Sequence, residues 1–231
     1  MQFKRKDRAQ ALQPVGRQVK AWHKASRKMG WGIRRDSFAN IGTPPPLTER
    51  ERAEGFIGSG LFYGFGDDGN GNADAVLSGR LVWEYALRLW RIKTWQCEYI
   101  DFNTSDRIRL RAGAPARPKG FYFAKFQPGM KYQTWTVSRL RRRLSDDETG
   151  CAPEGIQLLA ITNTHLRNLM AEKRIPFMAL ADYDVAPYGF NDFFDAAQIF
   201  FNQDVLGLGI GNLDRNYPRF GIPTLRFDAP S

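Results

Sequence analysis

The stretch from Pro14 to Gly30 has the most regular pattern in the sequence and constrains the fold of the N-terminal part. At about 100° per residue, its cations fall in one sector of a helix and its large apolar residues in the opposite one. The cations are Arg17, Lys20, Lys24, Arg27 and Lys28, and the apolar residues are Val15, Val19, Trp22 and Met29. Pro14 suits the first turn and Gly30 the position past the end, so the stretch predicts a basic amphipathic helix.

Such a helix suits several roles. It can bind nucleic acid, lie on an anionic membrane, present its apolar face to a protein partner, or pack on its own domain. Trp22 centres the apolar face, so we expect it to anchor the helix to an apolar surface. An acid-poor amphipathic N-terminus also fits an organellar transit peptide, but this one is rich in Lys and poor in Ser.

The positive charge of the chain is concentrated at its N-terminus. Residues 1–36 hold eleven Lys and Arg against two Asp, a net charge of +9, whereas residues 37–231 hold 23 basic and 22 acidic residues. A charge block of this kind attracts polyanions without regard to their sequence. We therefore divide the chain into a basic helical arm, residues 1–36, and a single α+β domain, residues 37–231, with Arg34 and Arg35 adding to the basic surface.

Composition limits the class of protein. A chain of 231 residues with 42% hydrophobic content can bury one substantial core. Cys97, Cys151 and two histidines form neither a disulfide framework nor a cysteine zinc site, which indicates a reduced, cytoplasmic protein. No apolar run approaches the roughly 20 residues of a membrane span, so we expect a soluble chain without a transmembrane segment.

The body reads as a mixture of helices and strands. A capping box at Thr48 and Glu51 starts a short helix, and residues 73–91 predict a longer one with one apolar face. Strands are expected at 94–102 and 107–111, and residues 120–126 and 132–137 read as a hairpin. Residues 192–201 read as a helix capped by Asn191. These elements predict a mixed sheet with three or four helices after the basic helix.

Residues 156–183 predict a βαβ-like unit: a strand IQLLAIT, a helix near 164–173 and a strand PFMALADY. Parallel strands would bring the turn at His165 close to Asp182 and Asp184, at the edge where ligands bind in open α/β sheets. His165, Asp182 and Asp184 are therefore the candidate catalytic residues of a carboxylate-dependent, metal-assisted hydrolase. The alternative is structural: a capping threonine, a histidine in the first helical turn, and aspartates that shape a loop.

Two other motifs lack residues that binding of their ligand requires. Gly58, Gly60 and Gly64 lack the preceding strand and the following acid of a dinucleotide fingerprint, and tight packing explains them better. The alternation from Asp68 to Asp74 resembles a calcium loop, but Ala73 and Gly79 occupy the positions of the turn glycine and the bidentate glutamate. We expect no bound metal or other cofactor.

These observations favour a non-enzymatic binding protein whose arm engages a polyanion, most plainly nucleic acid, as in mobile-element or assembly-associated proteins. The predicted contacts are Arg17, Lys20, Lys24, Arg27, Lys28, Arg34 and Arg35. A protein partner could use the face formed by Val15, Val19, Trp22 and Met29. The hydrolase is the second hypothesis, so enzymatic activity stays open, and a scaffold whose arm packs on its own domain is the third.

Overall fold

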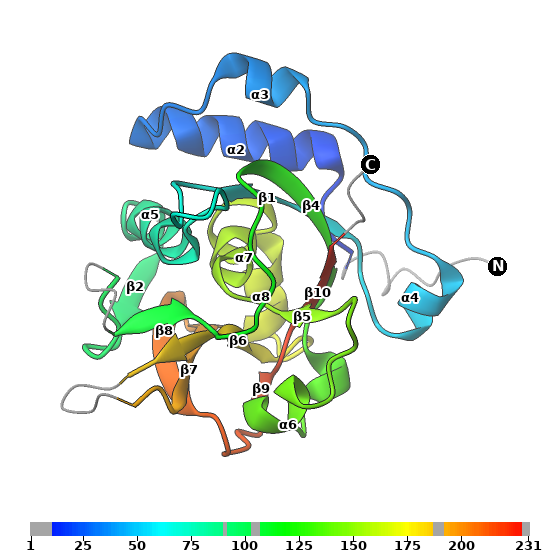
Figure 1. The fold of residues 1–231 in the computed structure, drawn as a ribbon, viewed down its shortest axis with the longest axis vertical. Coiled ribbons are helices and arrows are strands. Elements are labelled where there is room, and N and C mark those ends of the chain that lie inside the picture. Colours follow the sequence, from blue (N-terminus) through cyan, green and yellow to red (C-terminus); the bar gives the residue numbers. More distant parts are fainter. Residues whose placement is uncertain (1–10, 90–91, 103–106, 187–191, 228–231) are drawn as a thin grey trace.

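The computed structural model describes residues 11–89, 92–102, 107–186 and 192–227. Within these ranges the chain forms seven α-helices and two β-sheets, which confirms the predicted α+β class (Figure 1). The helices are α2 (Val15–Met29), α3 (Arg35–Ala39), α4 (Glu49–Ala53), α5 (Ala75–Leu87), α6 (Val137–Arg141), α7 (Pro153–Gln157) and α8 (His165–Ala171). Two single-turn segments, the 3₁₀ turn η1 (Met130–Tyr132) and the π-helical turn η2 (Leu158–Thr162), complete the helical structure of these ranges.

The strands divide between a smaller and a larger sheet. In the antiparallel four-stranded sheet the order is β1 (Ser59–Gly64), β4 (Gly120–Gln127), β10 (Thr224–Phe227) and β5 (Thr149–Gly150). In the larger sheet the order is β2 (Lys93–Gln96), β8 (Val205–Asn212), β7 (Asp195–Asn202), β6 (Phe177–Val185) and β3 (Ile108–Leu110), with β9 (Phe220–Gly221) also paired to β6.

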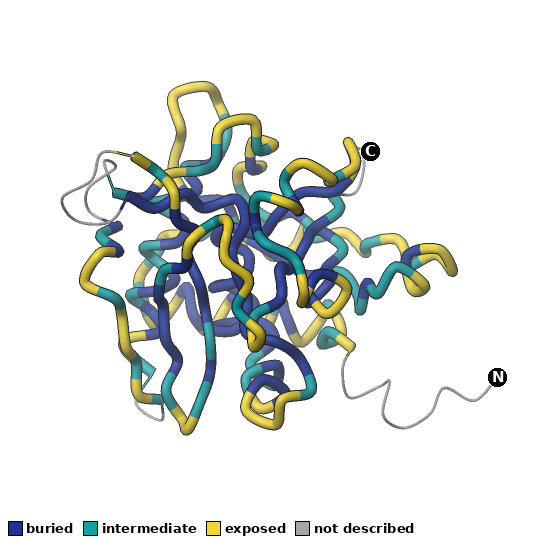
Figure 2. Tube along the Cα trace, turned by 90° about the horizontal axis from the view of Figure 1, so that it is seen from below, coloured by how far each residue is buried: buried dark blue, intermediate teal, exposed yellow. Residues whose placement is uncertain are grey.

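The continuous helical segment α7–η2 lies between the two sheets (Figure 1). On one side, Tyr122 of β4 donates a hydrogen bond to Glu154 of α7 at 2.8 Å. On the other side, Leu180 of β6 packs so closely on Gly155 that a Cβ there would lie 2.5 Å from its side chain. Every residue of α7 and η2 is buried, and buried residues run through the middle of the molecule while exposed ones gather in its loops (Figure 2).

Helix α2 forms as expected and packs on the body through its apolar face. Trp22 is completely buried, and its indole nitrogen donates a hydrogen bond to the Leu61 carbonyl at 2.9 Å. Aromatic rings surround it at centroid distances of 6.0–6.3 Å: Trp31, Tyr63, Phe65 and Phe121. The prediction that Trp22 anchors this helix to an apolar surface is confirmed, and the surface belongs to the same chain.

Local capping signals also give the expected helices. Thr48 and Glu51 form a reciprocal capping box at the start of α4. Asp74 accepts hydrogen bonds from the backbone N–H groups of Val76 and Leu77 at 2.9 and 3.0 Å and so starts α5 within the predicted range 73–91.

The expected βαβ-like unit is not formed. Residues 156–162 are helical, as the end of α7 and as η2, and β6 is antiparallel to both β3 and β7. The physical reason is burial on all sides: an apolar run with no exposed face has no period that separates a strand from a buried helix. Pro153 in the first turn of α7 is the local signal that favours the helix.

Two other expectations need the same kind of correction. Residues 195–202 form strand β7 rather than a helix, and β7 and β8 make a hairpin across Gln203 and Asp204, whose positive φ angles of 48° and 65° suit a two-residue turn. The predicted cap Asn191 lies outside the described residues. Residues 132–137 are not a strand: β4 pairs with β1 and β10, and Thr136 caps α6.

Candidate functional site

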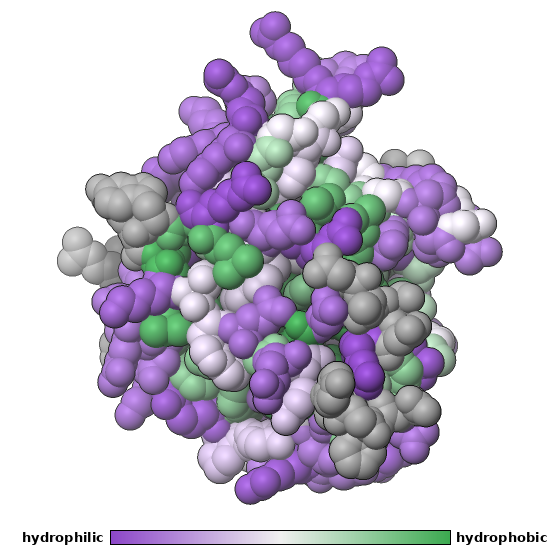
Figure 3. All heavy atoms as spheres, turned by 90° about the vertical axis from the view of Figure 1, so that its left-hand side faces the viewer, coloured by the Kyte–Doolittle hydropathy of each residue, from purple (hydrophilic) through white to green (hydrophobic). Residues whose placement is uncertain are grey.

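The cations of α2 form an exposed surface, here called the cationic face, that comprises Arg17, Lys20, Lys24, Arg27 and Lys28. Within the described part of the chain, none of these five side chains forms an ion pair with a carboxylate. Arg17 donates to the Gln13 side-chain oxygen at 3.2 Å, and Lys28 donates to the Arg88 carbonyl at 2.8 Å. Hydrophilic side chains gather at the end of the molecule where α2 and α3 lie (Figure 3).

The predicted extension of this surface lies directly after α2. Arg34 and Arg35 are both exposed, at the start of α3. Arg34 is 3.8 Å from Asp36, a pair so exposed that it contributes little attraction. The cations at positions 4, 5, 6 and 8 lie outside the described residues. The described part of the arm therefore presents seven of the predicted contact residues to solvent.

The apolar face of α2 is engaged inside the protein. Trp22 is fully buried, and Val15, Val19 and Met29 are half-buried. Gln18, also fully buried, holds the helix from the same side: its amide donates to the carbonyls of Gln13 and Ser59 and accepts from the Leu61 N–H. A membrane or a protein partner could use this face only by detaching the helix from its own core.

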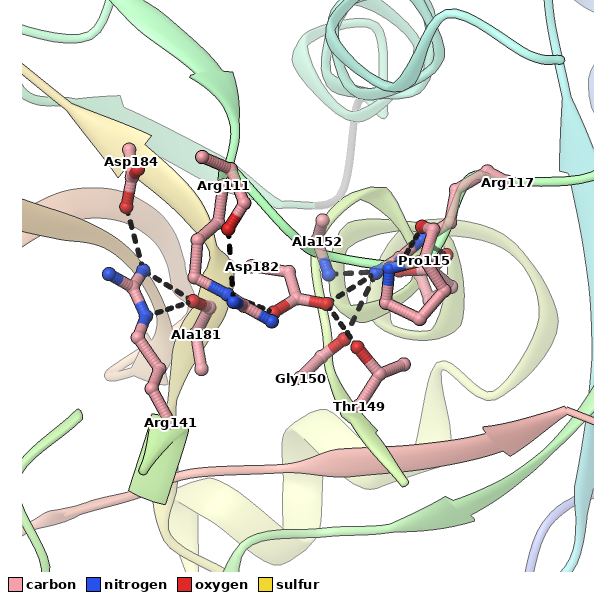
Figure 4. Close-up of polar contacts among 12 residues, drawn as sticks. Arg111, Pro115, Arg117, Arg141, Thr149, Gly150, Ala152, Ala181, Asp182 and Asp184 are labelled. Atoms are coloured by element: carbon pink, nitrogen blue, oxygen red, sulfur yellow. Dashed lines mark hydrogen bonds and ion pairs between the residues drawn. The ribbon is translucent and has the colours of Figure 1, made fainter. Parts of the chain in front are cut away.

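Asp182, one of the candidate catalytic residues, is completely buried in strand β6 and bound by two arginines (Figure 4). Arg111 Nε lies 3.0 Å from one carboxylate oxygen, and Arg117 Nη2 lies 3.1 Å from the other. The second oxygen also accepts a hydrogen bond from the Thr149 hydroxyl. The carboxylate is therefore neutralised and hydrogen-bonded within the fold.

Arg117 connects Asp182 to a second buried carboxylate. Its guanidinium donates to Glu154 at 2.8 Å and to the carbonyls of Pro115 and Gly150 (Figure 4). Burial alone would lower the pKa of Arg117, but the charges of Glu154 and Asp182 hold it above its ordinary value. Burial and, after it, the charge of the same glutamate raise the pKa of Tyr122 well above its ordinary value. Arg117 thus remains charged and Tyr122 neutral.

Asp184, two residues further along β6, has its own arginine. Arg141 Nη2 lies 2.8 Å from one carboxylate oxygen of Asp184, and Arg109 Nε lies 3.8 Å from the other. Arg141 also donates to the Ala181 carbonyl at 2.8 Å, which fixes it beside the strand (Figure 4). We call Asp182, Asp184, Glu154, Arg111, Arg117 and Arg141 the arginine–carboxylate cluster.

His165 lies apart from this cluster, at the first position of α8. Its Nδ1 accepts from the Gln13 side-chain amide at 3.2 Å, and its Nε2 donates to the Ala11 carbonyl at 3.1 Å. Burial lowers the pKa of His165, which suits the neutral tautomer required by these two contacts. The three candidate catalytic residues are therefore not brought together: His165 binds the segment before α2, and the two aspartates bind arginines.

The chemistry of the arginine–carboxylate cluster differs from that of a metal site. A divalent cation at Asp182 would have to displace two guanidinium groups, one of them fully buried. The described residues also contain no group of three or more His, Cys, Asp or Glu side chains placed to hold a metal. In the calcium-like loop, Asp68 accepts from the backbone of Asn70 and Asn72, and Asp74 caps α5.

Sequence reasoning did not find the arginines of this cluster. Arg117 lies in AGAPARPKG, which reads as an exposed turn, yet its side chain is 1% exposed. A cation between two prolines carries no local sign of burial, and Glu154 lies 37 residues away along the chain. Only the three-dimensional meeting of these segments defines the cluster.

Comparison with known proteins adds no assignment. No protein-family model matches the chain, and neither a curated protein nor a solved structure is significantly similar to it. None of the helices in the described ranges combines the length and the apolar character needed to cross a membrane.

Proposed function

We propose that this protein binds nucleic acid through the cationic face of α2, extended by Arg34 and Arg35. The observation that carries the proposal is the state of these side chains: they are exposed, and those of α2 have no carboxylate partner in the described part of the chain. Free cations of this kind release counterions from a phosphate backbone when they bind it.

The docking of α2 favours a polyanion over a membrane. A helix that lies on a bilayer buries its apolar face among lipids, but here that face holds Trp22 in the core. The cations lie on the exposed side of a rigid support about 22 Å long, with at least one cation on every turn. Such a surface can follow a run of phosphates without unfolding any part of the protein.

The hydrolase alternative receives no support from the geometry. Its two aspartates are engaged with arginines, and its histidine binds Gln13 and Ala11 instead. These contacts favour a structural role for the carboxylates.

The test compares two charge variants in anisotropy titrations with duplex and single-stranded nucleic acid over a salt series. Lys20→Gln with Arg27→Gln removes two cations of the cationic face. The control, Arg142→Gln with Arg143→Gln, removes two exposed cations beside α6, at the opposite end of the molecule (Figure 1).

We expect the α2 variant to bind duplex more weakly and its log–log salt slope to fall in magnitude by about 2, since each phosphate contact contributes about 0.9. The control should bind as the parent does. Equal losses in both variants would mean that net charge alone, and not the cationic face, attracts the nucleic acid.

A further inference from the structure

A second feature lies beside the cationic face, where α2, α5, η2 and α8 meet. These elements and the segment after α5 line a cavity of about 330 Å³ that opens to solvent, at the small end of the range for ligand sites. Its wall is largely apolar: Ala21, Leu89, Ile92, Ala160 and Ile161. Among the residues that the structure describes, four polar side chains interrupt this wall, namely Lys24, Tyr85, Thr164 and Arg167.

Arg167 is a half-buried cation without a counter-charge. Its Nε donates to the Thr164 carbonyl at 3.1 Å, but its Nη1 is buried and has no hydrogen-bond partner. Within the described part of the chain no carboxylate pairs with it, and the ring of Phe201 lies 5.8 Å from its guanidinium. Burial lowers its pKa to about 10. An unpaired cation withdrawn from water is costly to the fold unless an anion compensates it.

The other polar groups of the cavity also lack hydrogen-bond partners among the described residues. The ammonium of Lys24 and the hydroxyls of Tyr85 and Thr164 form no hydrogen bond with the described residues. None of the described residues that line the cavity is an Asp or Glu. The wall therefore offers two positive charges and two hydroxyl donors, which suits an anion with two negative charges and several acceptor oxygens better than a carboxylate.

We propose that this cavity binds the phosphate group of a phosphomonoester, with Arg167 and Lys24 as the charged contacts and Tyr85 and Thr164 as hydroxyl donors. The apolar wall then covers a small organic group attached to the phosphate. Two sources supply this chemistry: the terminal phosphate of a nucleic acid, and a small phosphorylated molecule. The proposal does not depend on nucleic-acid binding by the cationic face: the two sites share Lys24, but Arg167 lies on α8, and Lys20 and Arg27 are not among the described residues that line the cavity.

The test is isothermal titration calorimetry with phenyl phosphate on the full chain. Arg167→Met should weaken binding at least about tenfold, as expected for the loss of a charged hydrogen-bond donor. Lys24→Gln, an exposed change that the fold tolerates, should weaken it less. The control Lys20→Gln, one turn earlier on α2 and outside the cavity, should bind as the parent does. Absence of binding to the parent, or equal affinity in Arg167→Met and parent, would overturn the proposal.

A melting curve without ligand separates binding from structure. Because Arg167 has no counter-charge, Arg167→Met should melt at or above the temperature of the parent, whereas an arginine that serves the fold would lower it on removal. A clear loss of stability in this variant would therefore also count against the site.

Two oligonucleotides of one sequence, with a 5′-phosphate or a 5′-hydroxyl, distinguish the sources. If the ligand is a nucleic-acid end, only the phosphorylated strand should displace phenyl phosphate. If it is a small molecule, neither strand should displace it, and the phenyl phosphate result still supports the cavity. The Lys20→Gln, Arg27→Gln variant should weaken oligonucleotide binding but not phenyl phosphate binding, so the two proposals fail separately.

Discussion

At the scale of residues, Arg117 determines how the centre of the molecule holds together. Its guanidinium joins Glu154 of α7, Asp182 of β6 and the Gly150 carbonyl of β5, so three elements meet at one side chain. A buried cation of this kind must be matched by buried anions, and here both carboxylates have further partners in Tyr122, Thr149 and Arg111. Glu154 and Asp182 are thus both hydrogen-bonded and paired with Arg117, and removal of either carboxylate leaves this buried cation short of a partner.

Replacement of Asp182 should therefore be much more damaging than replacement of Asp184. Asp182→Asn leaves Arg117 and Arg111 short of a negative charge in the core, and we expect the free energy of unfolding to fall by about 3–5 kcal/mol. Asp184 is also buried, but Arg109 is half-exposed and Arg141 keeps its hydrogen bond to the Ala181 carbonyl, so Asp184→Asn should cost less. Urea unfolding of both variants measures the difference.

The same variants test the metal hypothesis. We expect the parent to melt at the same temperature in millimolar magnesium, manganese or calcium as in chelator, because the arginines already neutralise both carboxylates. A metal-dependent stabilisation that disappears in the Asp182→Asn, Asp184→Asn double variant would favour the hydrolase instead.

At the scale of elements, the sequence predicts those whose signals are local. The basic helix, the α5 helix and the capping box at Thr48 follow from period and caps, and each of them is present. The α7–η2 segment could not be predicted in the same way, because it is buried on every side and has no polar face to set its period.

The candidate catalytic site depended on that segment. If residues 156–162 were a strand parallel to β6, His165 and Asp182 would share one sheet edge. Because residues 156–162 are helical, α8 does not start at the edge of the β6 sheet, and His165 at its first position contacts the segment before α2. This wrong prediction for residues 156–162 is therefore the one that had grouped the three residues, which the structure holds apart.

This contact of His165 makes the attachment of the N-terminal segment depend on pH. Burial lowers the pKa of His165 below its ordinary value of about 6.5, so the unfolded state takes up the proton first. The stabilisation is thus complete above about pH 6.5 and is lost as the pH falls further.

We expect faster amide exchange of residues 11–13 at pH 5 than at pH 8, after correction for intrinsic rates. His165→Asn, which does not titrate, should remove this difference, and an unchanged pH dependence in the variant would assign it to other groups.

At the scale of the whole molecule, the basic arm and the body are not independent parts in space. Trp22 and Ala25 of α2 belong to the same buried cluster as Leu61, Phe126 and Leu180 from both sheets. The positive charge of the arm nevertheless remains on the surface, because α2 turns its cationic face outward and its apolar face inward. One helix therefore completes the core and supplies the proposed binding surface.

This double role determines what a truncation will do. A chain that starts at Ser37 loses Trp22 and Gln18 and uncovers Tyr63, Phe65 and Phe121, so its core is no longer closed. Loss of one buried tryptophan already costs about 3–5 kcal/mol, a large part of the 5–15 kcal/mol that stabilises a typical domain. We expect this chain to lack the cooperative thermal transition of the parent in circular dichroism. A chain that starts at Ala11 loses four Lys and Arg but keeps α2, and it should retain that transition. If the chain from Ser37 melted as the parent does, α2 would be a detachable arm. The loss of nucleic-acid affinity in this chain would then measure directly how much the arm contributes to binding.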